Sequence, residues 1–260
     1  MVDVSFNLNN FEYFILIMIR ILSFVTVAPI FGNNAVPRKV KVGLSFFVSL
    51  IIYNSIDYPA LNYDSIFGYA VIVFMETVTG LLTGYGANIC SSIIFFAGNV
   101  IDMDIGFSMV TEFSPETNSE VTITGNFYYY LVMLLLLISD MHTYVLRAVC
   151  DSFQLVPIGG SSFQWDSLLL TMTKFITDTF VIGFRIFLPF FACIMILNCI
   201  LGIMAKVSPQ MNMFSVGMQL KVLTGLVVML LTIFLLPRIS EYIFDEIKFI
   251  VRAIIEGMHT

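Results

Sequence analysis

The chain has 260 residues, of which 58% are hydrophobic and only 12% are charged, and its formal net charge is −6. Soluble domains are roughly 45–50% apolar and about 25% charged, and a soluble fold of this length has too little interior to hide so much apolar surface. The composition therefore excludes an ordinary soluble domain and indicates a lipid bilayer as the solvent.

Uncharged runs divide the chain into six to eight expected helical segments. Three runs approach the ~20 residues that a helix needs to cross the hydrocarbon core: residues 77–101, 121–139 and 186–205. Three others are shorter: residues 21–37, 42–56 and 222–237. The runs are continuous rather than alternating, which favours helices over a β-barrel. We therefore expect an all-α, polytopic integral membrane protein built from helical hairpins.

The first apolar stretch, residues 11–31, contains Arg20. A charge at the centre of a bilayer costs about 2.5–3.5 kcal/mol. Arg20 either pairs with a carboxylate on a neighbouring helix, such as Glu76, or extends its guanidinium to the membrane surface. The bases that follow, at residues 38–41, predict a cytoplasmic first loop by the positive-inside rule.

Glycines gather in the next long apolar stretch, residues 66–101, at Gly80, Gly84 and Gly86. They permit either a bend that turns the stretch into a hairpin or the close approach of a second helix. Close packing is the interpretation that we favour.

An acidic loop of 25 residues without a basic side chain, residues 102–126, separates two apolar segments. Long loops in compact proteins tend to be functional. Gly106, Phe107, Met109 and Phe113 suit a flexible apolar constriction, which can hold a pore closed by dewetting and deform around a passing chain. The alternative is an ordinary acidic surface loop.

Charges recur in the apolar stretch 175–205, where Asp178 and Arg185 are seven residues apart and so share one side of a helix. Lys174 has the better spacing for a local pair with Asp178. A proton relay through these groups is the alternative, because ionisable side chains within membranes mark such paths in pumps.

The last third of the chain contains a short loop and an amphipathic segment. Pro209 ends the preceding helix and Asn212 closes the turn between Lys206 and Lys221. Residues 238–257 predict an amphipathic helix, because isoleucines recur at helical spacing: Ile239, Ile243, Ile247, Ile250 and Ile254.

Two other protein classes fit the sequence less well. An intramembrane enzyme would need a catalytic motif, and the chain has no His-Glu-x-x-His, Gly-x-Ser-x-Gly or P-loop sequence beside its Asp140–His142 pair. A secondary transporter of a small solute, the alternative function, would favour repeated halves, which the sequence does not show. We expect no enzymatic activity, no metal site and no cofactor.

Four segments, in this order, resemble the FliR family of flagellar export proteins and SctT, its relative in injectisomes. The first segment is an Arg20-containing helix followed by Ala28-Pro-Ile-Phe-Gly32 and Val36–Lys41. The other three are Gly98–Pro115, Asp151–Gly159 and Ser208–Phe214. They extend from about residue 13 to residue 225, so the resemblance covers most of the chain.

The resemblance implies a structural, pore-forming subunit of the flagellar type III protein export gate, which conducts unfolded flagellar proteins across the inner membrane. It implies one membrane domain, residues 1–260, in which a FliP-like part (1–160) containing the pore loop 102–126 precedes a FliQ-like helical hairpin with a C-terminal amphipathic helix (161–260). The implied partners are FliP and FliQ in a hetero-oligomer, FlhA, FlhB, the exported chains and membrane lipid, without nucleic acid. The implied location is the bacterial inner membrane, at the flagellar basal body, and an injectisome remains the alternative system.

The resemblance also assigns roles to residues. The plug that closes the resting pore is expected at Gly106, Phe107, Ser108, Met109, Phe113 and Pro115. Buried charges that hold the assembly are expected at Arg20, Glu76, Asp178 and Arg185. A loop that contacts neighbouring subunits is expected at Pro209, Gln210, Met211, Asn212 and Phe214.

Overall fold

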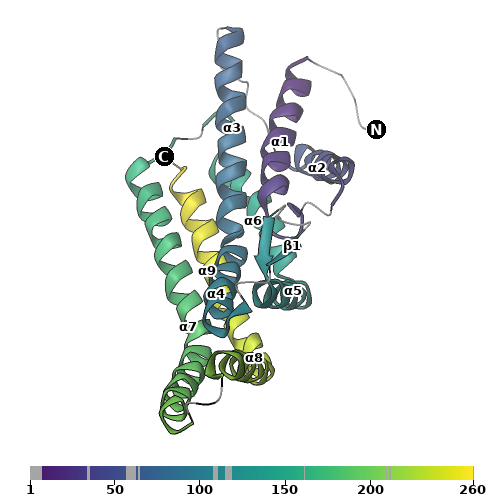
Figure 1. The fold of residues 1–260 in the computed structure, drawn as a ribbon. Coiled ribbons are helices and arrows are strands. Elements are labelled where there is room, and N and C mark those ends of the chain that lie inside the picture. The colour runs from purple at the N-terminus through teal and green to yellow at the C-terminus, as the bar shows by residue number, and fades with distance from the viewer. Residues whose placement is uncertain are drawn as a thin grey trace. The chain divides into compact units, whose positions relative to one another are not determined.

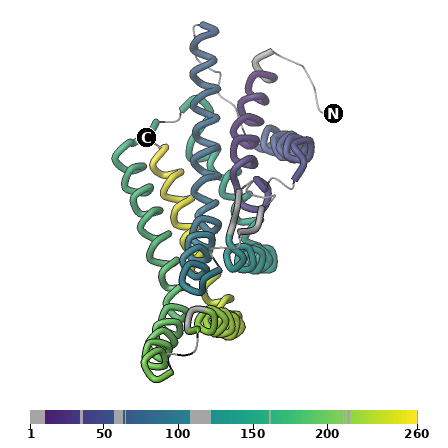
Figure 2. Tube along the Cα trace, in the orientation of Figure 1, coloured from purple at the N-terminus to yellow at the C-terminus, as the bar shows by residue number. Residues whose placement is uncertain are grey.

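The computed structural model describes residues 8–33, 36–56, 63, 65–107, 111–114, 119–160, 162–208, 210 and 212–259. Over these residues the chain forms nine α-helices, which Figures 1 and 2 colour in chain order. They are α1 (Leu8–Val27), α2 (Arg38–Tyr53), α3 (Ile66–Ala87), α4 (Ile89–Ile105), α5 (Ile123–Ile138), α6 (Met141–Leu155), α7 (Trp165–Val207), α8 (Met213–Thr232) and α9 (Leu236–Glu256). A short 3-10 turn, Ile233–Leu235, joins α8 to α9.

The predicted all-α membrane fold is confirmed, with one local addition. Strands β1 (Thr111–Ser114) and β2 (Ser119–Thr122) form an antiparallel hairpin within the loop 102–126. The helix count exceeds the expected six to eight because the stretch 66–101 is interrupted at Asn88. This interruption follows the glycines of α3 rather than coinciding with them.

Three helical segments of the described chain are long and apolar enough to cross a membrane: Ile66–Ala87, Trp165–Val207 and Ser215–Glu256. A fourth span is added if α5 and α6 together count as one broken span. The 43 residues of α7 correspond to about 65 Å of helix, twice the ~30 Å hydrocarbon core.

The chain folds into two compact units. Unit 1 comprises residues 1–89, 140–175 and 246–260, and unit 2 comprises residues 90–139 and 176–245. Each unit thus draws on both the proposed FliP-like part and the proposed FliQ-like part. The division into a FliP-like and a FliQ-like part is a statement about likeness to other proteins. Contacts within one chain do not test it, so it stays a prediction.

Close contact between α1 and α3 organises unit 1, and the two helices lie side by side in Figure 1. A Cβ added at Gly80 would overlap the carbonyl oxygen of Arg20, and one at Gly84 would lie 2.9 Å from that of Phe24. A Cβ at Gly86 would lie 2.5 Å from the side chain of Ile254 in α9. The glycines of α3 therefore serve close helix packing, as in other helices with small residues at their interfaces.

Unit 2 has its own apolar core, and a hydrogen bond between distant residues joins α5 to α8. The hydroxyl groups of Tyr128 in α5 and Thr232 in α8 are 2.6 Å apart, and the ring of Tyr128 packs edge-on against Phe190 in α7. Tyr128 is 4% exposed, so its hydroxyl needs this partner.

The predicted amphipathic helix at the C-terminus corresponds to α9. Of its five isoleucines at helical spacing, Ile239 is half-buried and the other four are fully buried: Ile243, Ile247, Ile250 and Ile254. The opposite face carries exposed side chains, among them Tyr242 at 58%. The helix is therefore held against the protein by its apolar stripe.

Candidate functional site

Arg20 and Glu76 form a buried ion pair between α1 and α3 in unit 1. Nε of Arg20 donates a hydrogen bond of 2.5 Å to Oε2 of Glu76, and the two side chains are 1% and 0% exposed. Of the two alternatives for Arg20, the structure therefore shows pairing and not a guanidinium that extends to a membrane surface.

The same pair also binds the turn that follows α6. Nη1 of Arg20 donates to the carbonyl oxygen of Val156 at 2.9 Å, and Oε1 of Glu76 accepts from the amide of Gly159 at 3.1 Å. Cζ of Arg20 lies 4.3 Å from the ring centroid of Phe153, which is a cation–π contact. Among the described residues, Nη2 of Arg20 has no hydrogen-bond partner.

This buried charge cluster, made by Arg20, Glu76, Phe153, Val156 and Gly159, joins three segments that are far apart in the sequence. A buried ion pair adds little net stability when it is formed, since desolvation offsets the attraction, but breaking it from one side costs about 3–5 kcal/mol. The cluster therefore selects which segments pack together in unit 1.

Asp102 holds together the two ends of the predicted pore loop, residues 102–126, in unit 2. Its carboxylate accepts a hydrogen bond of 3.0 Å from the amide of Thr124 and another from the Thr124 hydroxyl group. Both residues are fully buried. Burial raises the pKa of the Asp102 carboxyl group, and the hydrogen bonds from Thr124 lower it only in part.

The contact between Asp102 and Thr124 satisfies a helix end. Thr124 belongs to the first turn of α5, whose amides have no acceptor within the helix and whose dipole attracts a negative charge. One turn earlier in α4, a Cβ added at Gly98 would overlap the backbone of Gly125. We call Gly98, Asp102, Thr124 and Gly125 the loop base, because they bring α4 and α5 together at the two ends of the loop.

Gly106 begins the loop immediately after α4. Its φ of +100° lies in the left-handed region that L side chains rarely adopt, and its amide donates to the carbonyl oxygen of Asp102 at 3.0 Å. Phe107 follows and is half-buried. Of the other predicted plug residues, Ser108, Met109 and Pro115 lie outside the described residues, and Phe113 is placed only by its backbone, in β1. The plug itself stays a prediction.

The predicted charges of α7 have different surroundings. Arg185 is exposed and lines a pocket of unit 2 together with Arg238 of α9, and Asp178 is not part of that pocket. Lys174 lies 3.4 Å from Glu246 of α9 and above the ring of Phe249. A pair between Lys174 and Asp178 stays a prediction.

The predicted subunit-contact loop lies between α7 and α8. Gln210 and Asn212 are exposed there, and Asn212 immediately precedes α8. Phe214 belongs to the first turn of α8. Pro209 and Met211 lie outside the described residues. The exposure of Gln210 and Asn212 leaves them accessible to another chain, and the contact itself stays a prediction.

Two features of the site were not predicted from the sequence. Asp102 enters the sequence prediction only as the first residue of the acidic loop 102–126, although its place directly after the uncharged run 77–101 marks it as a helix-end group. Arg238 enters it only as the first residue of the predicted amphipathic helix 238–257. Within the described part of the chain, no three His, Cys, Asp or Glu side chains lie together as metal ligands would.

Comparison with known proteins gives the family. Residues 11–247 match the family described as bacterial export proteins, family 1. The chain is 30% identical over 226 residues to the flagellar biosynthetic protein FliR of Bacillus subtilis, an alignment that covers 86% of each chain. The chain belongs to the FliR family. FliR of Escherichia coli is 25% identical over 233 residues, which cover 88% of this chain and 87% of that one, and FliR of Aquifex aeolicus is 24% identical over 214 residues.

The match to the bacterial export family begins before Arg20 and ends after Arg238. The loop base and the buried charge cluster thus both lie in the part of the chain that characterises FliR proteins. The resemblance that was stated on four short segments is confirmed over most of the chain.

Proposed function

We propose that this chain is a structural, pore-forming subunit of a flagellar export gate, in which the loop 102–126 closes the resting pore. Membership of the FliR family supports a role in flagellar protein export, because the relatives are named flagellar biosynthetic proteins. The observation that carries the gating role is the loop base, which anchors both ends of a long loop at one point of a membrane protein.

The exposed surface of α7 supports assembly with other subunits. Leu169, near the start of this helix, is 62% exposed, and Val207, at its end, is 76% exposed. The 38 residue steps from Leu169 to Val207 correspond to about 57 Å of helix. Measured along the helix, this length is nearly twice the ~30 Å hydrocarbon core.

One bilayer therefore does not cover the whole apolar length of α7, and other protein is needed for the remainder. An isolated monomer would leave such side chains in water, which costs about 1.5–3 kcal/mol for each large apolar residue. The expected neighbours are FliP and FliQ subunits in the inner membrane, with FlhA and FlhB completing the apparatus at the flagellar basal body.

The geometry of the loop base supports a plug that moves as a unit. Asp102 and Thr124 hold its ends at a buried point, and Gly106 supplies the left-handed turn by which the chain leaves α4. A loop fixed at both ends can be displaced by an exported chain and return to the same place. Its apolar residues then seal the pore by excluding water.

Deleting residues 106–113 tests this role. The expected result is a resting membrane that leaks small ions in cells that carry the assembled gate, because the apolar seal is removed. A second variant replaces the same eight residues with a flexible Gly-Ser segment of equal length. It keeps the loop's length but not its apolar side chains, so it should leak as well if those side chains form the seal. An unchanged conductance in both variants, with normal assembly, would contradict the plug.

A further inference from the structure

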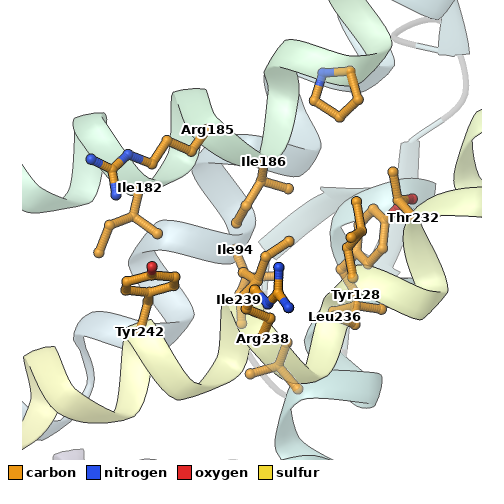
Figure 3. Close-up of a pocket in the computed structure, with 13 residues that line it drawn as sticks. Ile94, Tyr128, Ile182, Arg185, Ile186, Thr232, Leu236, Arg238, Ile239 and Tyr242 are labelled. Atoms are coloured by element: carbon orange, nitrogen blue, oxygen red, sulfur yellow. The ribbon is translucent and has the colours of Figure 1, made fainter.

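A pocket of about 340 Å³ opens in unit 2 between α7 and α9, with walls completed by α4 and α5 (Figure 3). Its volume is within the range of about 300–1,000 Å³ that is typical of small-molecule sites. Most of the lining is apolar, including Ile94, Val132, Ile186 and Leu236. The hydroxyl groups of Tyr128 and Thr232, which also line the pocket, bind each other. The interior therefore suits a hydrocarbon chain.

Two arginines give this apolar pocket a positive charge. Arg185 extends from α7 and Arg238 from α9, and both line the pocket and are exposed (Figure 3). No acidic residue lines the pocket, and neither arginine forms an ion pair with another described residue. Two exposed guanidinium groups beside an apolar pocket attract an anionic group, and their planar donors suit a phosphate.

The position of Arg185 along α7 indicates where that counter-charge could come from. Residues 186–205 form an uncharged run of 20 residues between Arg185 and Lys206. Twenty helical residues span about 30 Å, which equals the thickness of the hydrocarbon core. A helix inserted over this run would place Arg185 at the level of the lipid headgroups, where long basic side chains meet lipid phosphates.

We propose that the pocket binds an anionic phospholipid, with one acyl chain among the apolar residues and the phosphate beside Arg185 and Arg238. The combination of an acyl-sized apolar cavity with two unpaired guanidinium groups at its mouth carries this assignment. It concerns how the subunit is held by its membrane and does not depend on the plug, so it stands even if the loop 102–126 closes no pore.

A second pocket provides a contrast within the same chain. It has about 390 Å³ and lies in unit 1, where it is lined by Arg147 and Arg252. The carboxylate of Asp151 lines it as well. Because this acid offsets the positive charge, an anionic lipid has less reason to bind there, although the number of arginines is the same.

Lipid retention by the full-length chain, purified with its assembly partners, tests the proposal. Native mass spectrometry would compare bound phosphatidylglycerol, cardiolipin and phosphatidylcholine at equal added concentrations. We expect the two anionic lipids to be retained, and the Arg185→Gln and Arg238→Gln substitutions each to weaken that binding about fivefold, since one base contributes roughly this factor at an anionic surface. The matched control, Arg147→Gln with Arg252→Gln, should leave retention unchanged.

A further variant, Ile239→Trp, fills the apolar part of the pocket and leaves both arginines in place. This variant should retain less lipid than the unaltered protein. Inorganic phosphate, added to the unaltered protein as a competitor, should displace little of the bound lipid. Equal retention of phosphatidylcholine, an equal loss in the control variant, or full retention in Ile239→Trp would overturn the proposal. So would an Arg185→Gln/Arg238→Gln double variant that keeps its lipid but loses partner subunits, because the arginines would then bind a partner's carboxylate.

Discussion

The buried pair of Arg20 and Glu76 gives the sharpest quantitative prediction. Among the described residues, replacing Arg20 with Met leaves the buried Glu76 carboxylate with the Gly159 amide as its one hydrogen-bond partner, and it also removes the donor to the Val156 carbonyl group. Replacing Glu76 with Gln leaves a buried guanidinium without a counter-charge. Each single change should lower the free energy of unfolding by about 3–5 kcal/mol. That is a large share of the about 5–15 kcal/mol by which domains are stable.

The double variant, Arg20→Met with Glu76→Gln, should be more stable than the sum of the two single changes predicts. Both charges are then absent, so neither is left buried and unpaired, and replacing a whole buried ion pair by neutral residues is often close to neutral. A double-mutant cycle, measured by denaturant unfolding of the detergent-solubilised protein with circular dichroism, should give a coupling free energy of at least about 3 kcal/mol, because the two single costs sum to about 6–10 kcal/mol and the double variant is expected to cost much less.

The partly exposed pair between Lys174 and Glu246 provides the matched control. Their side chains are 40% and 19% exposed, so solvent screens the attraction. Glu246→Gln should therefore cost no more than about 1 kcal/mol. Single changes at Arg20 and Glu76 that also cost less than about 1 kcal/mol, or a cycle that is additive, would show that the buried pair does not hold unit 1 together.

Three other substitutions test packing and the loop base. Asp102→Ala removes both hydrogen bonds to Thr124, at a cost of about 1–3 kcal/mol. Amide hydrogen exchange over residues 119–126 should therefore accelerate about 5- to 150-fold, and unchanged exchange would refute the role of Asp102 in the loop base. Gly106→Ala puts a Cβ on a left-handed residue and should destabilise the loop's exit from α4 by about 1 kcal/mol, seen as faster proteolysis of the loop. Gly80→Ala should prevent α1 from packing on α3 and lower the melting temperature, whereas Gly202→Ala, in open space, should not; equal effects would argue against close packing.

Much of the fold could be predicted from local sequence patterns. The uncharged runs set the helices because each backbone polar group in a bilayer must bond within its own segment, and this requirement acts over about 20 consecutive residues. The isoleucine spacing of residues 238–257 likewise indicated α9, whose buried stripe includes Ile243 and Ile250. The FliR resemblance rested on short segments in a constant order, and such order is a property of the chain alone.

Sequence patterns were less informative about breaks in helices. The glycines at positions 80, 84 and 86 allowed either a bend or close packing, because a missing side chain serves both. The structure places them inside α3, against α1 and Ile254, and interrupts the helix at Asn88 instead. Only the presence of a neighbouring backbone distinguishes the two uses.

By itself the sequence determined that this protein is a membrane-embedded, helical member of the FliR family, because hydropathy, periodicity and motif order are read along the chain. Only the tertiary structure decided which charged groups meet. Arg20 and Glu76 are 56 positions apart and Asp102 and Thr124 are 22 apart, while Arg185 and Arg238 line one pocket from two different helices. Such pairings depend on how helices pack across the fold, and side-chain spacing within one helix carries no information about the helix that lies against it.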